Sequence, residues 1–179
     1  MRPTLFLNRA SAYLYLGILL LAVQASFFLL HACRDSSSNH TTITENDIRT
    51  MMQEVEAATL GKDLDGIMKH LAPFVVITVS METPYGLQRI QMTRDQYREE
   101  LKKTFAGLSH YEYEHDNDQI TVAPDGRTAI TETVVTEVLV VDGQESRTTT
   151  REKVYLEIVD GEILVSRIDG TIRALDTGE

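Results

Sequence analysis

The stretch that decides the fold reads TAITETVVTEVLVV (128–141), DG (142–143), SRTTTREKVYLEIV (146–159), DG (160–161) and ILVSRIDGTI (163–172). Apolar and polar side chains largely alternate along its three long segments, and β-branched residues are frequent. This pattern is typical of strands with one buried face. The two Asp-Gly pairs favour tight hairpin turns, because both residues tolerate positive φ. The sequence therefore predicts an antiparallel meander of three strands.

Helical patterns come before the meander. Thr44 and Asp47 fit a capping box, and apolar residues then recur at helical spacing from Ile48 to Ala58. Asp63 is predicted to cap a second short helix that runs to Leu71. The helix is expected to end there because Pro73 follows, and the residue before a proline disfavours the helical conformation.

Between these helices and the meander the pattern changes several times. The β-branched segment 74–79 predicts a strand, and 81–91 is expected to be either a short hairpin or a loop. Thr93 caps a helix that extends to Leu108. Tyr111–Val122 is a further strand candidate, interrupted by the polar residues 116–118.

Helices first and strands last indicate an α+β fold, in which a curved antiparallel sheet carries the N-terminal helices on one face. We expect a signal peptide or membrane anchor at 1–33, a polar linker at 34–42, one domain at 43–175 and a short tail at 176–179. About 135 residues are sufficient for a single core.

The N-terminal segment has the features of an export signal. Arg2 and Arg9 precede an uncharged stretch from Ala10 to Ala32, and the only cysteine, Cys33, follows at once. Three outcomes remain open: lipidation of Cys33, an uncleaved membrane-spanning anchor, or an ordinary cleaved signal. All three place the rest of the chain outside the cytoplasm, and the first two tie it to a membrane.

The segment Leu29-Leu30-His31-Ala32-Cys33 resembles the lipobox of bacterial lipoproteins, although His31 stands where that family usually has a small or apolar residue. The resemblance implies that the cysteine is lipidated and becomes the new N-terminus. A single cysteine cannot form an internal disulfide, so lipidation also explains why the chain has just one.

Charge and missing motifs exclude several classes of function. The whole chain carries a net charge of −10, and because Arg2 and Arg9 are the only charges before Cys33, the part from Cys33 onward carries −12. A nucleic acid partner is therefore not expected. The sequence contains no G-x-G-x-x-G, Walker, H-E-x-x-H, G-x-S-x-G or C-x-x-C motif, so we expect no cofactor and no metal.

The run Lys62-Asp63-Leu64-Asp65-Gly66-Ile67, followed by the strand at 74–79 and the C-terminal meander, resembles the NTF2-like superfamily of SnoaL-like proteins and ketosteroid isomerases. The resemblance implies a cone-shaped fold with a pocket on the concave face. Ketosteroid-isomerase relatives place a tyrosine and two acids in that pocket, and the matching positions here are Val55, Val79 and the neighbourhood of Val154. Isomerase activity of that kind is therefore not expected.

Other residues are weaker catalytic candidates. His70 lies near the end of the second helix, and its imidazole has a pKa suited to a general base. Glu132 and Glu137 interrupt an apolar strand on opposite faces, and Asp169 lies on the last strand. The alternative interpretations are a histidine at a helix end and acids paired with bases on neighbouring strands.

One strand face combines His110, Glu112, Glu114 and Asp116. Such residues can bind a metal, but alternating charge is also how a strand faces water, and the solvent-facing interpretation is preferred. Aromatic side chains on the opposite face of this strand, on the preceding helix and on the strand at 146–159 are expected to line a ligand pocket; they are Tyr97, Phe105, Tyr111, Tyr113 and Tyr155.

Three functions follow from this pattern. The first is a membrane-anchored, non-catalytic domain outside the cytoplasm that binds a small apolar ligand or a protein partner. The second is a SnoaL-like isomerase, dehydratase or hydrolase with an unrecognised acid–base pair. The third is an assembly module that forms a homodimer through its sheet.

Overall fold

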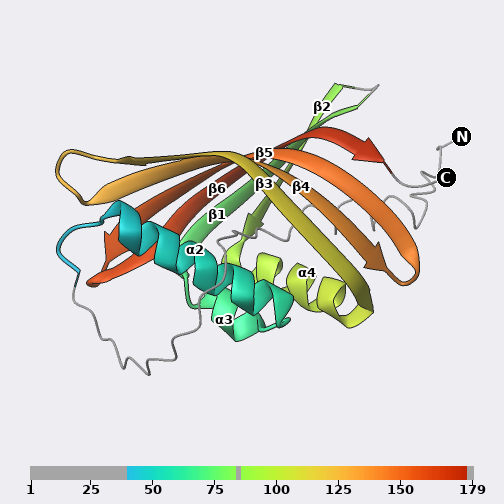
Figure 1. Ribbon diagram of the computed structural model, residues 1–179, viewed down its shortest axis with the longest axis horizontal. Coiled ribbons are helices and arrows are strands. Elements are labelled where there is room, and N and C mark those ends of the chain that lie inside the picture. The colour runs from blue at the N-terminus through green and yellow to red at the C-terminus, as the bar shows by residue number, and fades with distance from the viewer. Residues whose placement is uncertain (1–39, 84–85, 177–179) are drawn as a thin grey trace, which may run out of the picture.

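A computed structural model describes residues 40–83 and 86–176 (Figure 1). The predictions for the export signal and for Cys33 lie outside these residues. Within the described ranges, no helix is both long enough and apolar enough to cross a membrane.

Three helices and six strands make up the described chain. In sequence order they are α2 (Glu45–Leu60), α3 (Leu64–Met68), β1 (Leu71–Thr83), β2 (Gly86–Thr93), α4 (Arg94–Gly107), β3 (Leu108–Val122), β4 (Thr128–Val141), β5 (Gln144–Val159) and β6 (Glu162–Asp176).

The predicted helix starts are confirmed. Thr44 closes a capping box with Asp47, since the backbone N–H of Thr44 donates to Asp47 Oδ2 at 2.9 Å and the backbone N–H of Asp47 donates to Thr44 Oγ1 at 3.2 Å. Thr93 and Gln96 form the same arrangement at α4. Asp63 caps α3, but this helix ends at Met68 rather than at Leu71, where β1 has already begun.

The strands form one sheet in the order β2-β1-β6-β5-β4-β3. The predicted meander of β4, β5 and β6 is confirmed as antiparallel. β1 pairs with the edge of β6 that does not contact β5, and it runs parallel to β6. This is the one parallel pair among the described strands. The segment left open as a hairpin or a loop is a hairpin of β1 and β2.

The turns and the predicted interruption follow the local chemistry. Asp142 and Gly143 have φ of 52° and 78°, and Asp160 and Gly161 have 52° and 84°, as expected for Asp-Gly hairpin turns. β3 continues through the polar residues 116–118, although its pairing with β4 shifts register between Asp116 and Gln119. The interruption seen in the sequence is therefore an irregularity within one strand.

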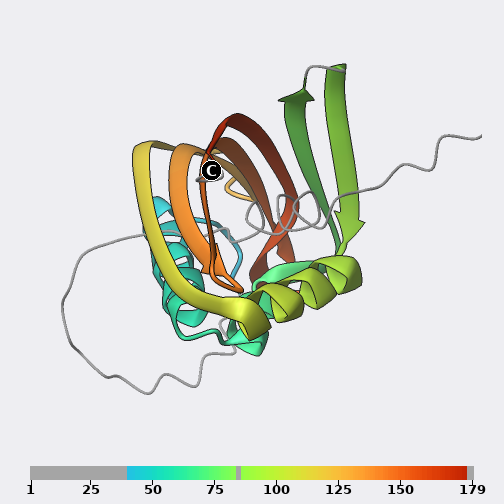
Figure 2. The same ribbon diagram turned by 90° about the vertical axis from the view of Figure 1, so that its right-hand side faces the viewer.

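The sheet arches over the three helices, which all lie on its concave side (Figures 1 and 2). Along β4, side chains alternate strictly between buried and half-buried positions, so every second residue faces the helices. Leu156 on β5, with 1% exposure, belongs to the same core as Ile48 on α2 and Leu101 on α4. No described helix covers the convex face, where Val134 is half-buried.

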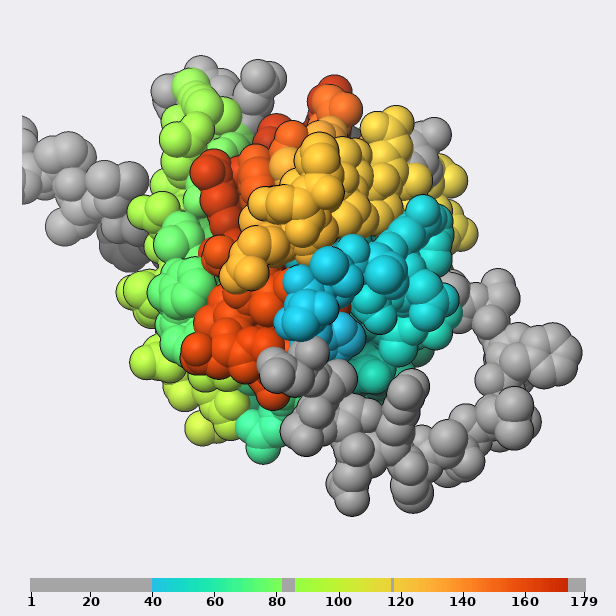
Figure 3. All heavy atoms as spheres, turned by 90° about the vertical axis from the view of Figure 1, so that its left-hand side faces the viewer, coloured from blue at the N-terminus to red at the C-terminus, as the bar shows by residue number. Residues whose placement is uncertain are grey.

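The segment that leads into α2 fastens it to two strand turns. The backbone N–H of His40 donates to Gly161 O at 2.8 Å, and that of Ile43 donates to Gly126 O at 2.7 Å. Figure 3 shows this blue segment against the orange turn between β5 and β6. Because both turns belong to the sheet, these bonds set the position of α2 over the concave face.

Candidate functional site

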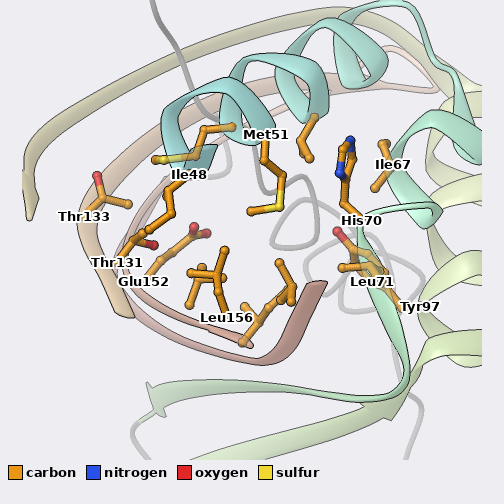
Figure 4. Close-up of a pocket in the computed structure, with 15 residues that line it drawn as sticks. Ile48, Met51, Ile67, His70, Leu71, Tyr97, Thr131, Thr133, Glu152 and Leu156 are labelled. Carbon is orange, nitrogen blue, oxygen red and sulfur yellow. The ribbon is translucent and has the colours of Figure 1, made fainter. Parts of the chain in front are cut away.

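The concave face encloses a cavity of about 60 Å³ between α2 and the sheet (Figure 4). At about 10–15 Å³ for each water-sized sphere, it has room for about four to six waters or an organic molecule of equal bulk. Most of its wall is aliphatic, and only a few side chains bring polar atoms to it. Its lining residues are Ile48, Met51, Met52, Val55, Ile67, His70, Leu71, Tyr97, Thr131, Thr133, Glu152, Val154, Leu156, Val165 and Ile168.

Glu152 is the most unusual residue of this wall. Its side chain points into the cavity (Figure 4), and the residue is only 3% exposed. Within the described ranges, no hydrogen bond or ion pair reaches its carboxyl group. Burial raises the pKa of Glu152 to about 8, because the charged form loses its hydration and gains no counter-charge. At neutral pH the carboxyl group is therefore mostly protonated.

The sheet leaves space beside Glu152. In the register of the sheet, Glu152 faces Thr133 on β4 and Gly170 on β6. Gly170 has no side chain, and a Cβ there would already be 3.4 Å from Thr150 Cγ2. Small neighbours on both sides thus leave the longer carboxyl side chain open towards the cavity.

A second buried acid lies further along the same face. Glu137 on β4 is 1% exposed, and the hydroxyl of Tyr111 donates a hydrogen bond to its Oε1 at 3.0 Å. Burial, followed by the charge of Glu152, raises the pKa of Glu137 well above its usual range. Burial also raises the pKa of the Tyr111 and Tyr113 hydroxyls, and the charges of Glu137 and Glu152 raise it further.

His70 lies on the other side of the cavity, with Met51 between it and Glu152 (Figure 4). Its Nε2 is 3.3 Å from Glu54 Oε2, but the two groups are not aligned for a hydrogen bond. Burial lowers the pKa of His70 to about 4, helped by the charge of Lys69 and opposed by that of Glu54. The cavity therefore has a neutral imidazole at one side and a protonated carboxyl group at the other near pH 7.

The predicted aromatic pocket is only partly assembled at this cavity. Tyr97 lines the wall, whereas Phe105 packs on the core from α4. Tyr111 and Tyr113 lie beside Glu137, with their ring centroids 6.4 Å apart. Tyr155 is on the convex face, where Arg167 lies 5.1 Å from its ring centroid, because strand alternation turns it away from Val154 and Leu156.

Two of the three catalytic candidates lie outside the cavity. Glu132 accepts a hydrogen bond from Lys153 Nζ at 2.7 Å, and this contact lowers the pKa of Glu132. Asp169 is bound by Arg167 at 2.6 Å. Both acids are on the convex face. Glu132 pairs with a base on the neighbouring strand, which is the alternative interpretation of the sequence, whereas the partner of Asp169 is on its own strand. Only His70 reaches the cavity.

The charged face of β3 is exposed to solvent, and His110 Nε2 lies 3.0 Å from Glu112 Oε1 there. In the described part of the chain, no three His, Cys, Asp or Glu side chains are arranged to hold a metal ion. Two of the valines matched to catalytic positions, Val55 and Val154, line the cavity, and Val79 belongs to the core.

Sequence reasoning missed Glu152, although a signal was present. Glu152 has the same strand parity as Val154 and Leu156, which the alternation places on the inner face. The neighbouring bases Arg151 and Lys153 have the opposite parity, so they point to the convex face, where both lie at Glu132. Strand parity, rather than the charge of the neighbours in the chain, indicates which face of the sheet an acid is on.

Replacing Glu152 should change how stability depends on pH. The carboxyl group of Glu152 loses its proton near pH 4.5 in the unfolded chain and near pH 8 in the folded protein. The contribution of Glu152 to the free energy of unfolding is therefore most favourable to the folded state below pH 4.5, and this contribution is lost as the pH rises to about 8. The slope is ~1.4 kcal/mol per pH unit for one such group. The lowered pKa of His70 has the opposite effect on the free energy of unfolding, which rises with pH between about pH 4 and 6.5 because of this residue. Glu152→Gln should therefore flatten the slope between pH 6.5 and 8.

The measurement is urea unfolding of the full chain in a nonionic detergent, followed by circular dichroism. Glu132→Gln is the control, because that acid is on the convex face and the pKa of its carboxyl group is lowered. Equal slopes for the wild type and Glu152→Gln above pH 6.5 would contradict the buried, protonated carboxyl group.

No family model and no curated protein sequence matches the chain. Solved structures do resemble it. An NTF2-like protein of unknown function in nutrient uptake from Rhodospirillum rubrum has a TM-score of 0.58 and 16% identity, over 72% of this chain and 99% of that one. An NTF2-like protein from Cytophaga hutchinsonii has a TM-score of 0.58 and 12% identity, over 73% and 100%.

A hexachlorocyclohexane dehydrochlorinase from Novosphingobium barchaimii also resembles the chain, with a TM-score of 0.55 and 9% identity over 72% of this chain and 86% of that one. Structures with this degree of similarity share an architecture, while the chemistry depends on the residues in each site. The curved sheet, the three helices on its concave side and these similarities show that the described domain has the NTF2-like α+β cone fold.

Proposed function

We propose that this domain binds a small, mainly apolar molecule in the cavity between α2 and the sheet. The observation that carries the proposal is an aliphatic cavity of about 60 Å³ that contains a buried carboxyl group without a partner. An apolar wall with few polar groups is the usual design of a small-molecule site, because burial supplies affinity and the polar groups orient the ligand. The protonated Glu152 can donate one hydrogen bond to such a ligand.

Filling the cavity should abolish binding. Val154→Phe extends a larger side chain into the space from β5, whereas Val134→Phe makes the same change on the convex face of β4. A ligand such as isobutanol at 100 times its Kd should stabilise the wild type by about 2.7 kcal/mol. Thermal unfolding with and without ligand should show this stabilisation for the wild type and Val134→Phe only. An undiminished shift for Val154→Phe would place the ligand elsewhere.

We also propose that the N-terminal segment anchors the domain at a membrane outside the cytoplasm through a lipid on Cys33. The support is the order of two arginines, an uncharged stretch and a single cysteine in the sequence. A lipid anchor beside the domain would keep the cavity near the membrane surface, where small apolar molecules accumulate.

Replacement of Cys33 tests the anchor. In a bacterial host supplied with a labelled fatty acid, the wild-type chain should incorporate the label and Cys33→Ser should lose it completely. Ser37→Ala is the control, because it changes the following polar run and leaves the cysteine in place. A wild-type chain that stays in the membrane without label would instead support an uncleaved anchor.

A second candidate function, elimination, is favoured by the opposite protonation states of His70 and Glu152. With a β-hydroxy ketone in the cavity, His70 would accept the proton from the carbon beside the carbonyl group. The electron pair of that C–H bond would form the new C=C bond. The C–O bond would break, and Glu152 would give its proton to the leaving oxygen, which departs as water. The structurally similar dehydrochlorinase makes elimination the natural reaction class to test.

The test follows the absorbance of the enone formed from 4-hydroxy-2-butanone. If the cavity catalyses elimination, the rate should rise as His70 loses its proton near pH 4 and fall as Glu152 loses its proton near pH 8. His70→Gln and Glu152→Gln should each reduce the rate at least 100-fold. The exposed His110 provides the control His110→Gln. A rate no higher than that in buffer rules out this reaction and leaves the binding proposal intact.

A further inference from the structure

The polar side of the cavity carries oxygen atoms and no basic group among its described residues. Glu152, Thr131 and Thr133 bring only oxygen atoms to this part of the wall, and no lysine or arginine is among the described residues that line the cavity. Beyond Glu152 the same face continues with the carboxyl group of Glu137 and the hydroxyls of Tyr111 and Tyr113. His70, on the opposite side, is neutral at pH 7 because burial lowers its pKa to about 4.

Two further oxygen atoms on the inner face of β5, outside the lining of the cavity, have no partner among the described residues. They are the buried hydroxyls of Thr148 and Thr150, which are 1% and 2% exposed. Glu152 is 3% exposed, points into the cavity and is reached by no hydrogen bond within the described ranges (Figure 4). Buried polar groups nearly always have partners, so a carboxyl group that points into a cavity and has no partner among the described residues is well placed to contact a group of a bound ligand.

We propose that the ligand of this cavity is a small organic cation, with an apolar body against the aliphatic wall and an ammonium group at the Glu152 carboxylate. This inference rests on the proposed binding function and names the class of ligand. An ammonium group has three N–H donors and no acceptor, so it matches a set of oxygen atoms. Its charge would also stabilise the ionised form of Glu152, for which no basic side chain among the described residues of the cavity wall provides a counter-charge. A neutral or anionic ligand would provide no such counter-charge.

The titratable groups near Glu152 support the same conclusion from each neighbouring element. Glu137 on β4 and Tyr111 and Tyr113 on β3 are all affected by its charge, and Glu56 on α2 acts on Tyr113. Every one of these groups is neutral or negative when it titrates. A bound cation would therefore make Glu152 ionise, and near neutral pH its proton would be released to the solvent.

Three small ligands of similar shape test the charge directly: isobutylamine, isobutanol and isobutyrate. Isothermal titration calorimetry uses the full chain in lipid nanodiscs at pH 7, with empty nanodiscs as the blank. The amine should bind at least tenfold more tightly than the alcohol, and the carboxylate least tightly. Titrations in two buffers of different ionisation enthalpy should show proton release for the amine and none for the alcohol.

Two variants assign the effect to Glu152. Glu152→Gln should remove the tenfold preference and the proton release while the alcohol still binds, whereas Glu132→Gln on the convex face should change neither. Equal affinity for amine and alcohol, or an amine preference that persists in Glu152→Gln, overturns the proposal that the ligand is a cation bound at Glu152. The proposal that the cavity binds a small apolar molecule would still stand. Failure of all three ligands to bind overturns both proposals.

Discussion

The domain depends on covering the concave face of one long, bent sheet. Alternation along β4 and β5 sends every second side chain to that face, and a row of apolar residues there is stable only when another apolar surface excludes water. α2, α3 and α4 supply that surface, with Ile48 and Leu101 in the same core as Leu156. The hydrogen bonds from His40 and Ile43 to two turns position α2 on the sheet.

A buried carboxyl group in this core has an energetic cost. Desolvation of an unpaired acid is unfavourable, and the protein limits the cost by keeping Glu152 protonated over most of the neutral range. The same residue type on the convex face behaves differently, because Glu132 pairs with Lys153 and stays ionised. Glutamine or valine would fill the Glu152 position at less cost. The energetic cost of this buried carboxyl group fits the proposed role of Glu152 in ligand recognition.

Small-molecule binding and elimination would use the same two residues in different ways. For binding, Glu152 provides a hydrogen bond or a counter-charge, and His70 is part of the wall. For elimination, a proton must leave the ligand for His70 while Glu152 supplies another, which requires the ligand to span the cavity around Met51. Val55 and Val154, at positions matched to isomerase residues, make the wall apolar in both cases. The ligand's functional groups, rather than the scaffold, therefore decide between the two.

The sequence by itself determined the local structure. Side-chain alternation, two Asp-Gly turns and the caps at Thr44, Asp63 and Thr93 depend on near neighbours, so they predict the meander and the helix starts correctly. Only the tertiary structure decided which strands meet and which acids are buried. The parallel pairing of β1 with β6 joins distant segments, and it has no local signature. Parity places Glu152 inside, but only the packing of α2 over the sheet leaves its carboxyl group buried and without a partner among the described residues.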